Sequence, residues 1–322
     1  MNKTVSIVMC TYNGAKYIRE QLDSIIKQTY PITEIIIQDD CSSDETIQIC
    51  EEYAKLYPIV KVRRNEKNIG VSLNFMLALE HAEGDFIAIS DQDDIWELNK
   101  IEKQVEALMA SDALLSCSLS KAFTNDNILI DEEIRIPNCG LIRQTFFPVL
   151  PGHAMVFRRE MLEFIPKELY GGSAYDLLLS LAGELFSKIL IVPYVLNHHR
   201  RHINAHSYSA PNNYKRSLSN MFRSSFRAVH AFRMGSETRK QNFAHKHQVI
   251  SDFKPNMNEK VRDALLFSKL MSEGSFLSLL RASFLCHKYR DELFYAKEKN
   301  ALIAHIRSIL FPILCSEYYY KP

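Results

Sequence analysis

The first 110 residues alternate between short apolar runs and amphipathic segments, and this alternation limits the fold more than any other feature of the chain. Short β-branched apolar runs predict buried strands, and the segments between them repeat apolar residues at helical spacing. Strands that alternate with helices form a mostly parallel α/β sheet with helices on both faces. The expected strands are 4–10, 34–38, 60–65 and 85–90, and the expected helices are 15–28, 42–56, 72–82 and 98–108.

Beyond residue 112 the alternation weakens. Residues 113–123 predict a further strand, residues 175–186 a helix, and the apolar run that begins at Lys188 a pair of strands. After about residue 210 we expect mostly helix. The chain is therefore predicted to contain an α/β catalytic region, residues 1–208, and a basic, mostly helical region, residues 209–322.

Composition places the chain among cytoplasmic proteins. The seven cysteines include no CxxC pair, which is typical of free thiols in a reducing cytosol. We see no signal peptide at the start of the sequence and no apolar stretch of about 18 residues that would predict a spanning helix. The net charge of +1 excludes no partner, but residues 200–254 hold 11 Lys or Arg against two Asp or Glu.

Polar clusters follow three of the expected strands. They read "TYN" at 11–13, "DD" at 39–40 and "DQDD" at 91–94. The carboxyl ends of parallel strands meet at one edge of a sheet, and ligands bind beyond that edge. The three clusters therefore predict a ligand site.

The acidic cluster predicts a metal site. Asp91 and Asp93 are two residues apart, so on an extended strand end their side chains point to the same side. Two carboxylates facing one way suit Mg²⁺ or Mn²⁺. The alternative is a solvated loop whose acids begin the next helix near Ile95, and we assign that part to Asp94.

For the other candidate residues, the sequence leaves both a binding role and a structural role open. Asp39 or Asp40 could accept a hydrogen bond from a base or a ribose hydroxyl, or cap the helix that follows. Asp176 stands at the front of an apolar helix, where an acid commonly stabilises the helix N-terminus. Arg200 and Arg201 suit phosphate binding. His202 lies among four histidines without a cysteine, a pattern that favours one His joining a carboxylate-bound metal over a zinc site.

Together these segments resemble the inverting family 2 glycosyltransferases of the GT-A fold. The resemblance covers about residues 3–208 and is closest over the first hundred. Its matching segments are "SIVMCTYNGAKYIREQLDSIIKQTY", "IIIQDDCSSDET", "NIGVSLNFMLALEHAEGDFIAISDQDD" and "RRHIN", and "SDQDDIW" looks most like the rhamnosyltransferase-like bacterial branch.

The resemblance implies roles on the donor side. Thr11, Asn13 and Asp39 would line the nucleoside pocket, with Asp40 close by. Asp91 and Asp93 would be the family's DxD motif, which binds the divalent ion and, through it, the donor diphosphate.

It also implies a base and a further metal contact. Asp176 matches the expected general base, and His202 matches a histidine that approaches the metal or the diphosphate. Gly152 matches a turn before the acceptor-side strand. Tyr175 and Leu177 replace a His and a Trp of the family's pattern, which leaves the transferred sugar and the acceptor open.

The expected function is a metal-dependent inverting transfer of a sugar from a nucleotide-diphosphate donor, dTDP-rhamnose or a UDP-hexose. The expected acceptor is a saccharide, lipid-linked, in surface polysaccharide biosynthesis. The alternative is a nucleotide-binding or receiver-like signalling module, because "IIIQDD" is similar to a phosphoacceptor segment. An oxidoreductase is disfavoured because no GxGxxG follows the first strand.

The basic region leaves two interpretations open. It is either a helical subdomain packed on the catalytic region or a peripheral docking element for the anionic inner face of the cell membrane. We favour docking, because "SFLSLLRASFLCHKY" and "ALIAHIRSILFPILC" are apolar with sparse positive charge. Nucleic acid is not an expected partner, since no recognisable module is present.

Overall fold

The structure is a computed structural model of the chain, and it describes residues 3–124, 129–130, 139–146, 150–201, 227, 229–293 and 301–314. The chain divides into two compact units. The first contains Met1–Ile136 and Leu150–His206, and the second contains Pro137–Val149 and Ser207–Pro322. The short segment 137–149 thus groups with the second unit, although it lies inside the sequence range of the first. The division into a catalytic region, residues 1–208, and a basic helical region, residues 209–322, stays a prediction.

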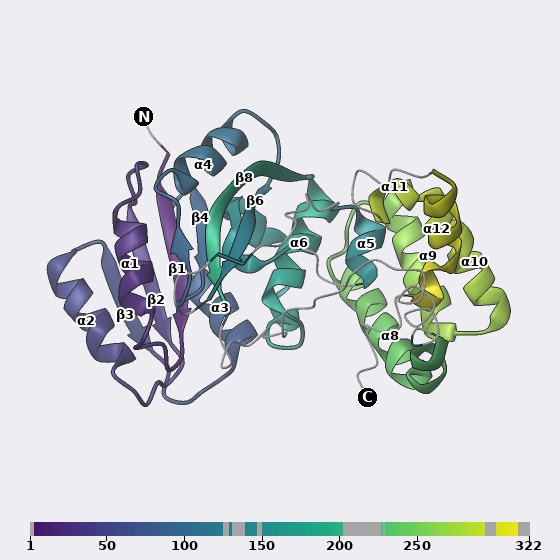
Figure 1. Cartoon of the computed structure of the whole chain (residues 1–322), viewed down its shortest axis with the longest axis horizontal. Helices are drawn as coiled ribbons and strands as arrows, with labels where there is room; N and C mark the ends of the chain where they lie inside the picture. The colour runs from purple at the N-terminus through teal and green to yellow at the C-terminus, as the bar shows by residue number, and fades with distance from the viewer. Residues whose placement is uncertain are drawn as a thin grey trace. The chain divides into compact units, whose positions relative to one another are not determined.

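The first unit is built on a mixed, mostly parallel sheet of eight strands with helices packed on it (Figure 1), as the sequence predicts. The strand order is β3-β2-β1-β4-β7-β6-β8-β5. The pairs β3–β2, β2–β1, β1–β4 and β6–β8 are parallel, and the pairs that involve β7 or β5 are antiparallel. The strands are β1 (Val5–Thr11), β2 (Glu34–Asp39), β3 (Val60–Arg64), β4 (Phe86–Ser90), β5 (Ile95–Trp96), β6 (Leu115–Phe123), β7 (Met155–Arg158) and β8 (Ile189–Arg200).

The main core of this unit lies between the sheet and three helices. Residues Val5, Ile7 and Met9 alternate along β1, so their side chains point to one face. On that face they pack with buried apolar residues of α1, α2 and α4. Helix α3 also packs against β1 and β2, and it contacts α6. The helices are α1 (Ile18–Ile26), α2 (Thr46–Leu56), α3 (Val71–Leu79), α4 (Lys100–Met109) and α6 (Tyr175–Phe186).

Two local predictions are wrong. The run from Lys188 forms one continuous strand rather than a pair, because β8 pairs with β6 along its length through register shifts at Ser118–Ser120. The helix expected over 98–108 is present as α4, but a start near Ile95 is wrong, because residues 95–96 form the short strand β5 against β8.

The second unit is helical, as expected for the part of residues 209–322 that the structure describes. Phe146, Phe243 and Phe267 meet in its core, with ring centroids 4.8–5.8 Å apart. The ammonium of Lys246 donates to the carbonyls of Thr145 and Phe146, where positive charge stabilises a helix C-terminus. The helices are α5 (Leu141–Phe146), α8 (Ser236–Asp252), α9 (Glu259–Glu273), α10 (Phe276–Lys288), α11 (Arg290–Leu293) and α12 (Ala301–Leu314).

Among the helices that the structure describes, none combines the length and the apolar character needed to cross a bilayer.

Candidate active site

The polar clusters that follow β1, β2 and β4 are joined by hydrogen bonds, which confirms that they meet at one edge of the sheet. The Thr11 hydroxyl donates to Asp39 over 2.9 Å. The Gln92 side chain accepts from the Tyr12 N–H and donates to the Tyr12 carbonyl, both at 3.0 Å. The loop after β4 is therefore fixed against the loop after β1.

Asp39 is fully buried and surrounded by donors. Besides Thr11, the hydroxyl and the N–H of Ser42 donate to its two carboxylate oxygens. The guanidinium of Arg64 lies 3.5 Å from the same carboxylate. The protein itself thus compensates the charge of Asp39.

Asp40 is also buried, and its charge is compensated in a different way. The N–H groups of Ile69 and Gly70 donate to its two oxygens at 2.9 Å, and Asn65 adds a third hydrogen bond. Ile69 and Gly70 form the turn directly before α3, so Asp40 fixes that turn and does not cap the helix that follows it in sequence. A receiver-type phosphoacceptor must be accessible, so the burial of both acids gives the signalling alternative no support.

Asn13 is exposed and has a left-handed backbone, with φ of 49°. Its side-chain carbonyl accepts from the N–H of Ser43 over 2.9 Å. The residue therefore connects the turn after β1 with the turn after β2. Thr11, Asn13, Asp39 and Asp40 lie at one rim, and their contact with a nucleoside stays a prediction.

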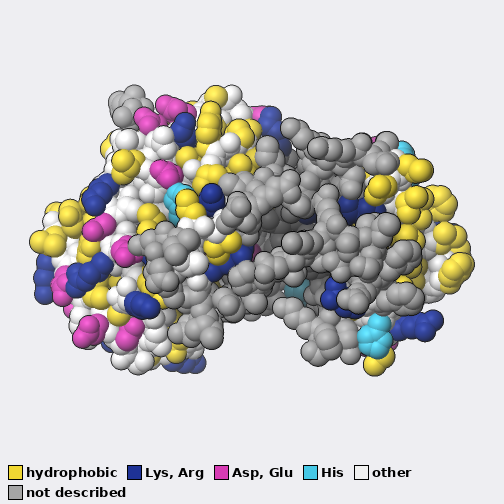
Figure 2. Space-filling view, in the orientation of Figure 1, with side chains coloured by type: hydrophobic (Ala, Val, Ile, Leu, Met, Phe, Trp, Pro, Cys, Tyr) yellow, Lys and Arg dark blue, Asp and Glu magenta, His cyan; other side chains and the backbone are white. Residues whose placement is uncertain are grey.

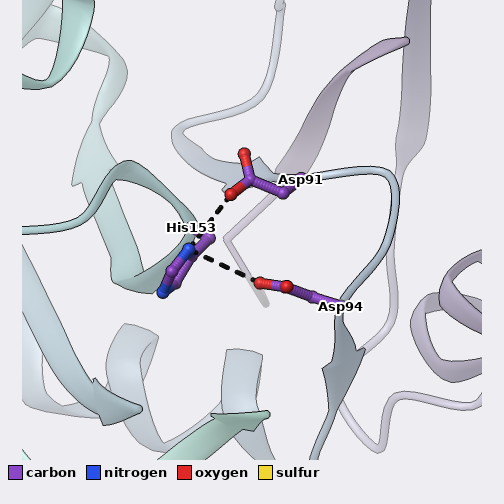
Figure 3. A group of neighbouring side chains, drawn as sticks. All are labelled: Asp91, Asp94 and His153. Atoms are coloured by element: carbon purple, nitrogen blue, oxygen red, sulfur yellow. Dashed lines mark hydrogen bonds and ion pairs between the residues drawn. The ribbon is translucent and has the colours of Figure 1, made fainter. Parts of the chain in front are cut away.

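A histidine lies between two acids of the loop after β4 (Figure 3). The Nδ1 atom of His153 is 3.1 Å from an oxygen of Asp91 and 3.5 Å from an oxygen of Asp94. The three side chains offer ligand atoms that all lie within 4.8 Å of one another. The other ring nitrogen of His153 faces the Ser120 hydroxyl at 3.2 Å.

Asp94 does not cap a helix, which corrects the sequence interpretation. Its carboxylate is buried and accepts hydrogen bonds from the Asn197 amide at 2.8 Å and the Arg200 N–H at 3.2 Å. Both donors lie on β8, the partner of β5. The pairing of β5 with β8 therefore turns Asp94 inward, toward His153.

Asp93 does not belong to the group of potential metal ligands found in the described part of the chain. Strand β4 ends at Ser90, so the extended geometry assumed for Asp91 and Asp93 does not hold. The Asp93 carbonyl accepts from the guanidinium of Arg200, which also forms an ion pair with Glu20. The metal role of Asp93 and the phosphate role of Arg200 remain predictions.

The electrostatics of the cluster favour added positive charge. Burial and the neighbouring acids raise the pKa of Asp94 to about 7, although His153 opposes that rise. Burial lowers the pKa of His153, but the attraction of Asp94 and Asp91 outweighs it and raises the pKa overall. Two carboxylates this close favour either a proton on one of them or positive charge between them. A proton on His153 or a bound cation would provide that positive charge.

The sequence interpretation missed His153. It lies just before the apolar strand β7, and "PGHAMVF" carries no recognised metal-ligand spacing. What brings His153 to the acids is the antiparallel pairing of β4 with β7. That pairing is a property of the sheet order, which spacing along the chain does not reveal.

Asp176 lies in the first turn of α6 and is partly buried. Burial raises the pKa of its carboxyl, the Leu177 N–H lowers it, and the charge of Asp91 raises it again, with a net rise. The neighbouring Tyr175 stacks on Phe75 with ring centroids 4.2 Å apart, and its ring fills the space beside Gly152. A side chain at position 152 would collide with that ring.

The basic end of β8 lies beside the same cluster. The ring of His199 stacks on His153 with centroids 5.5 Å apart. Burial, His153 and Arg201 lower the pKa of His199 to about 4, so its imidazole is neutral at pH 7. Arg201 is partly buried, and its N–H donates to the Phe123 carbonyl. His202 lies outside the described residues.

The geometry agrees with the comparisons to known proteins. Residues 6–165 match the family model described as glycosyl transferase family 2. The chain belongs to the family 2 glycosyltransferases.

Two curated glycosyltransferases match part of the chain. TuaG of Bacillus subtilis, a glycosyltransferase named for teichuronic acid biosynthesis, is 35% identical over 133 residues, 41% of this chain and 53% of TuaG. The dTDP-rhamnosyl transferase RfbG of Shigella flexneri is 39% identical over 110 residues, 33% of this chain and 38% of RfbG. The matches thus span about half or less of these relatives.

Solved glycosyltransferase structures share the fold over nearly the whole chain. Residues 1–349 of TarS from S. aureus, in complex with UDP-GlcNAc, align with a TM-score of 0.56 and 20% identity over 98% of this chain and 91% of that one. The mannosyltransferase PcManGT from Pyrobaculum calidifontis, in complex with GDP-Man and Mn²⁺, aligns with a TM-score of 0.53 and 17% identity over 99% and 87%. At this identity the likeness shows the GT-A-like fold alone.

Proposed function

We propose that the protein transfers a sugar, with inversion, from a nucleotide-diphosphate donor to a saccharide acceptor in surface polysaccharide biosynthesis. The observation that carries the proposal is the cluster of Asp91, Asp94 and His153 at the ligand edge of a family 2 glycosyltransferase sheet. The names of TuaG and RfbG support a polysaccharide product, and RfbG supports dTDP-rhamnose as a donor. The TarS complex supports a UDP-linked hexose.

The cluster fits a divalent ion such as Mn²⁺ or Mg²⁺. Two carboxylates and one imidazole nitrogen face one another, and hard or borderline cations take these ligands. When bound, the ion supplies positive charge that stabilises the departing diphosphate. Asp91 is the ligand common to the sequence prediction and the geometry. Asp93 and His202 remain candidate ligands from the sequence.

Asp176 is proposed to act as the general base. An acceptor hydroxyl is a weak nucleophile at neutral pH, and a carboxylate within hydrogen-bond reach removes its proton during attack. The raised pKa of Asp176 makes its ionised form a stronger base than an exposed aspartate. The proton moves to the carboxylate while the acceptor oxygen forms the new bond to the anomeric carbon, and the bond from that carbon to the diphosphate oxygen breaks on the opposite side.

The rim after β1 and β2 is proposed to hold the nucleoside. Thr11, Asp39 and Asp40 fix the loops, and Asn13 is the exposed polar member of the group. Arg200 and Arg201 lie at the end of β8, beside the acid cluster, and would add positive charge near the diphosphate.

The proposed acceptor is lipid-linked, so we place the reaction at the cytoplasmic face of the cell membrane. Residues 209–322 would bring the catalytic unit to that surface by peripheral docking. This placement extends the interpretation of the basic helical region, and flotation of the full chain with anionic vesicles tests it separately from turnover.

The deciding experiment combines binding and turnover. Nucleoside diphosphate sugars are screened for a rise in melting temperature that requires Mn²⁺ or Mg²⁺, since a ligand that binds the folded state stabilises it. The donor found in this way is then used for transfer assays. We expect Asp176→Asn to reduce transfer by about a thousandfold while the donor-induced stabilisation persists.

The matched control is Asp112→Asn, which removes an exposed carboxylate paired with Lys188 at the surface. It should leave both readouts unchanged. Normal transfer by Asp176→Asn would exclude Asp176 as the base, and stabilisation by no nucleotide sugar would contradict the proposed function.

A further inference from the structure

The hydroxyl of Tyr175 lies in the candidate active site and has no hydrogen-bond partner among the described residues. Tyr175 is the first residue of α6, directly before Asp176, and it is partly buried. A buried tyrosine usually gives its hydroxyl a partner within the protein. The side chain therefore has an unused hydrogen-bond donor next to the proposed base.

The ring of Tyr175 is fixed by two neighbours. It stacks on Phe75 of α3, which is buried, with ring centroids 4.2 Å apart and an angle of 26° between the ring planes. Its hydroxyl end lies against Gly152, where an added Cβ atom would be 2.3 Å from the hydroxyl oxygen. Because both neighbours restrict the ring, the hydroxyl is held in place before any ligand binds.

This hydroxyl also lies close to the acid cluster. Gly152 directly precedes His153, whose Nδ1 atom is 3.1 Å from Asp91 (Figure 3). Burial raises the pKa of Tyr175, and the charges of Asp91 and Asp176 raise it further. At neutral pH the phenol is therefore protonated, and it presents a donor near both the proposed metal ligand and the proposed base.

The position between these two acids identifies the group that the hydroxyl faces. In the proposed reaction, Asp91 acts through the ion on the diphosphate, and Asp176 acts on the acceptor hydroxyl. The transferred sugar lies between these two groups, because the bond that breaks and the bond that forms share its anomeric carbon. The hydroxyl oxygens of a sugar accept hydrogen bonds, so a fixed donor at this place suits the sugar.

We infer that Tyr175 is a specificity-determining residue, whose hydroxyl donates a hydrogen bond to a hydroxyl oxygen of the transferred sugar. The inference rests on the proposed function for the presence of a sugar donor, and it adds the group that recognises the sugar itself. A site that hydrogen-bonds a substrate hydroxyl selects against sugars that lack it, because the protein group would then stay unpaired.

The test compares nucleotide sugars with the same nucleotides without the sugar. Calorimetric titration of the full chain with Mn²⁺ uses dTDP-rhamnose and UDP-GlcNAc, with dTDP and UDP as their sugar-free counterparts. With the sugar that the wild type binds more tightly, we expect Tyr175→Phe to bind about tenfold more weakly, because one hydrogen bond is lost. Its affinity for the matching nucleoside diphosphate should change by less than about twofold, since that ligand has no sugar to transfer.

Stability separates this contact from a structural role. Tyr175→Phe keeps the ring on Phe75 and loses no hydrogen bond within the described residues, so urea unfolding should show wild-type stability. The matched control is Tyr30→Phe, whose lost hydroxyl donates to the Lys3 carbonyl before the amino end of β1. This control should be less stable than the wild type and should keep the full preference for the nucleotide sugar.

A second variant moves the hydroxyl without removing it. Gly152→Ala puts a Cβ atom where the end of the Tyr175 ring lies, so the ring must shift and the preference for the nucleotide sugar should fall as in Tyr175→Phe. The control is Gly172→Ala, whose Cβ atom would meet only the Leu169 carbonyl, at 3.7 Å. It should bind both ligands like the wild type.

Three results would overturn the inference. Tyr175→Phe could bind the nucleotide sugar as tightly as the wild type. It could instead lose affinity for the nucleotide sugar and the nucleoside diphosphate by the same factor, which would place the hydroxyl at the diphosphate. The third result is a loss of stability in Tyr175→Phe with unchanged preference for the sugar, which would assign the hydroxyl a structural role. If the wild type bound none of the four nucleotides, the proposed function itself would be contradicted, and the inference with it.

Discussion

Two acidic pairs lie at the ends of β2 and β4, the parallel strands on either side of β1, and their charges are compensated in different ways. Asp39 and Asp40 follow β2 and are surrounded by hydroxyl, amide, N–H and guanidinium donors of the protein. Asp91 and Asp94 follow β4 and share a single histidine. The protein itself compensates the charge of the first pair, whereas the described residues offer the second pair one shared histidine. Sequence alone shows two similar acidic pairs, and their surroundings favour the second as the metal-binding pair that we propose.

The largest effect should come from removing a carboxylate of the second pair. Asp91→Asn takes away one ligand of the proposed ion, so we expect transfer to fall by about a thousandfold and the metal-dependent rise in melting temperature to disappear. The metal-free variant should be at least as stable as the wild type, since one of two like charges is gone. Turnover assays and thermal unfolding with and without Mn²⁺ measure both effects, and a persistent Mn²⁺ response would break the contrast between the pairs.

Removing a carboxylate of the first pair should instead damage the fold. In Asp39→Asn the buried group loses its charge-assisted bonds to Ser42 and Arg64, which costs about 3 kcal/mol of unfolding free energy. The Mn²⁺-dependent rise in melting temperature should survive in the protein that remains folded. Urea unfolding gives the free energy, and a variant as stable as the wild type would show that these bonds contribute little.

The pH dependence of stability should separate the pairs next. The pKa of Asp94 is raised to about 7 in the folded protein, so the folded state holds this proton more tightly than the unfolded chain. Stability from this group is present below the unfolded pKa and is lost as pH rises through about 7. The raised pKa of His153 acts in the same direction. Without metal, we expect a loss of about 1 kcal/mol between pH 6 and 8.

Added Mn²⁺ should reduce that loss, because the ion replaces the proton as the compensating charge. Asp94→Asn should flatten the metal-free profile. Denaturant unfolding across this pH range measures both, and a profile that rises with pH would contradict the assigned charges.

The smallest expected effects are changes in Mn²⁺ affinity, and they should show whether His153 or Asp93 is a ligand. The described cluster contains His153 and not Asp93, so His153→Gln should weaken Mn²⁺ binding ten- to a hundredfold. Asp93→Asn should weaken it less than about threefold by the same reasoning. Electron paramagnetic resonance of Mn²⁺ measures both affinities without turnover. Equal losses of Mn²⁺ affinity in the two variants would support Asp91 and Asp93 as the ligand pair, as the sequence predicts.

The sequence predicted the sheet and the edge at which the polar residues gather, because both follow from local patterns. Apolar runs predicted β1, β2 and β4, and the polar residues after them meet as expected. The sequence did not predict the pairing of β5 with β8 or of β4 with β7. Those pairings turn Asp94 inward and bring His153 to the acids. Contacts between residues about 60 and 100 positions apart depend on strand order, which no local spacing encodes.

The exposed apolar side chains of α10 and α12 show a second limit of sequence patterns. Figure 2 shows apolar side chains gathered over the α10 side of the second unit. The apolar segments in α10 and α12 are visible in the sequence, but a buried helix core has the same composition. Only the exposure of Phe276 and Phe284 shows that these side chains remain uncovered in the described part of the second unit.

The most direct test of the account is an anomalous-difference map from crystals grown with Mn²⁺ and the nucleoside diphosphate found in the screen. We expect one strong peak in contact with Asp91, the Nδ1 atom of His153 and the diphosphate oxygens, at about 2.0–2.3 Å from each ligand. A map without a peak at this cluster, or with the ion on Asp39 and Asp40, would contradict the claim that the second acidic pair is the binding pair.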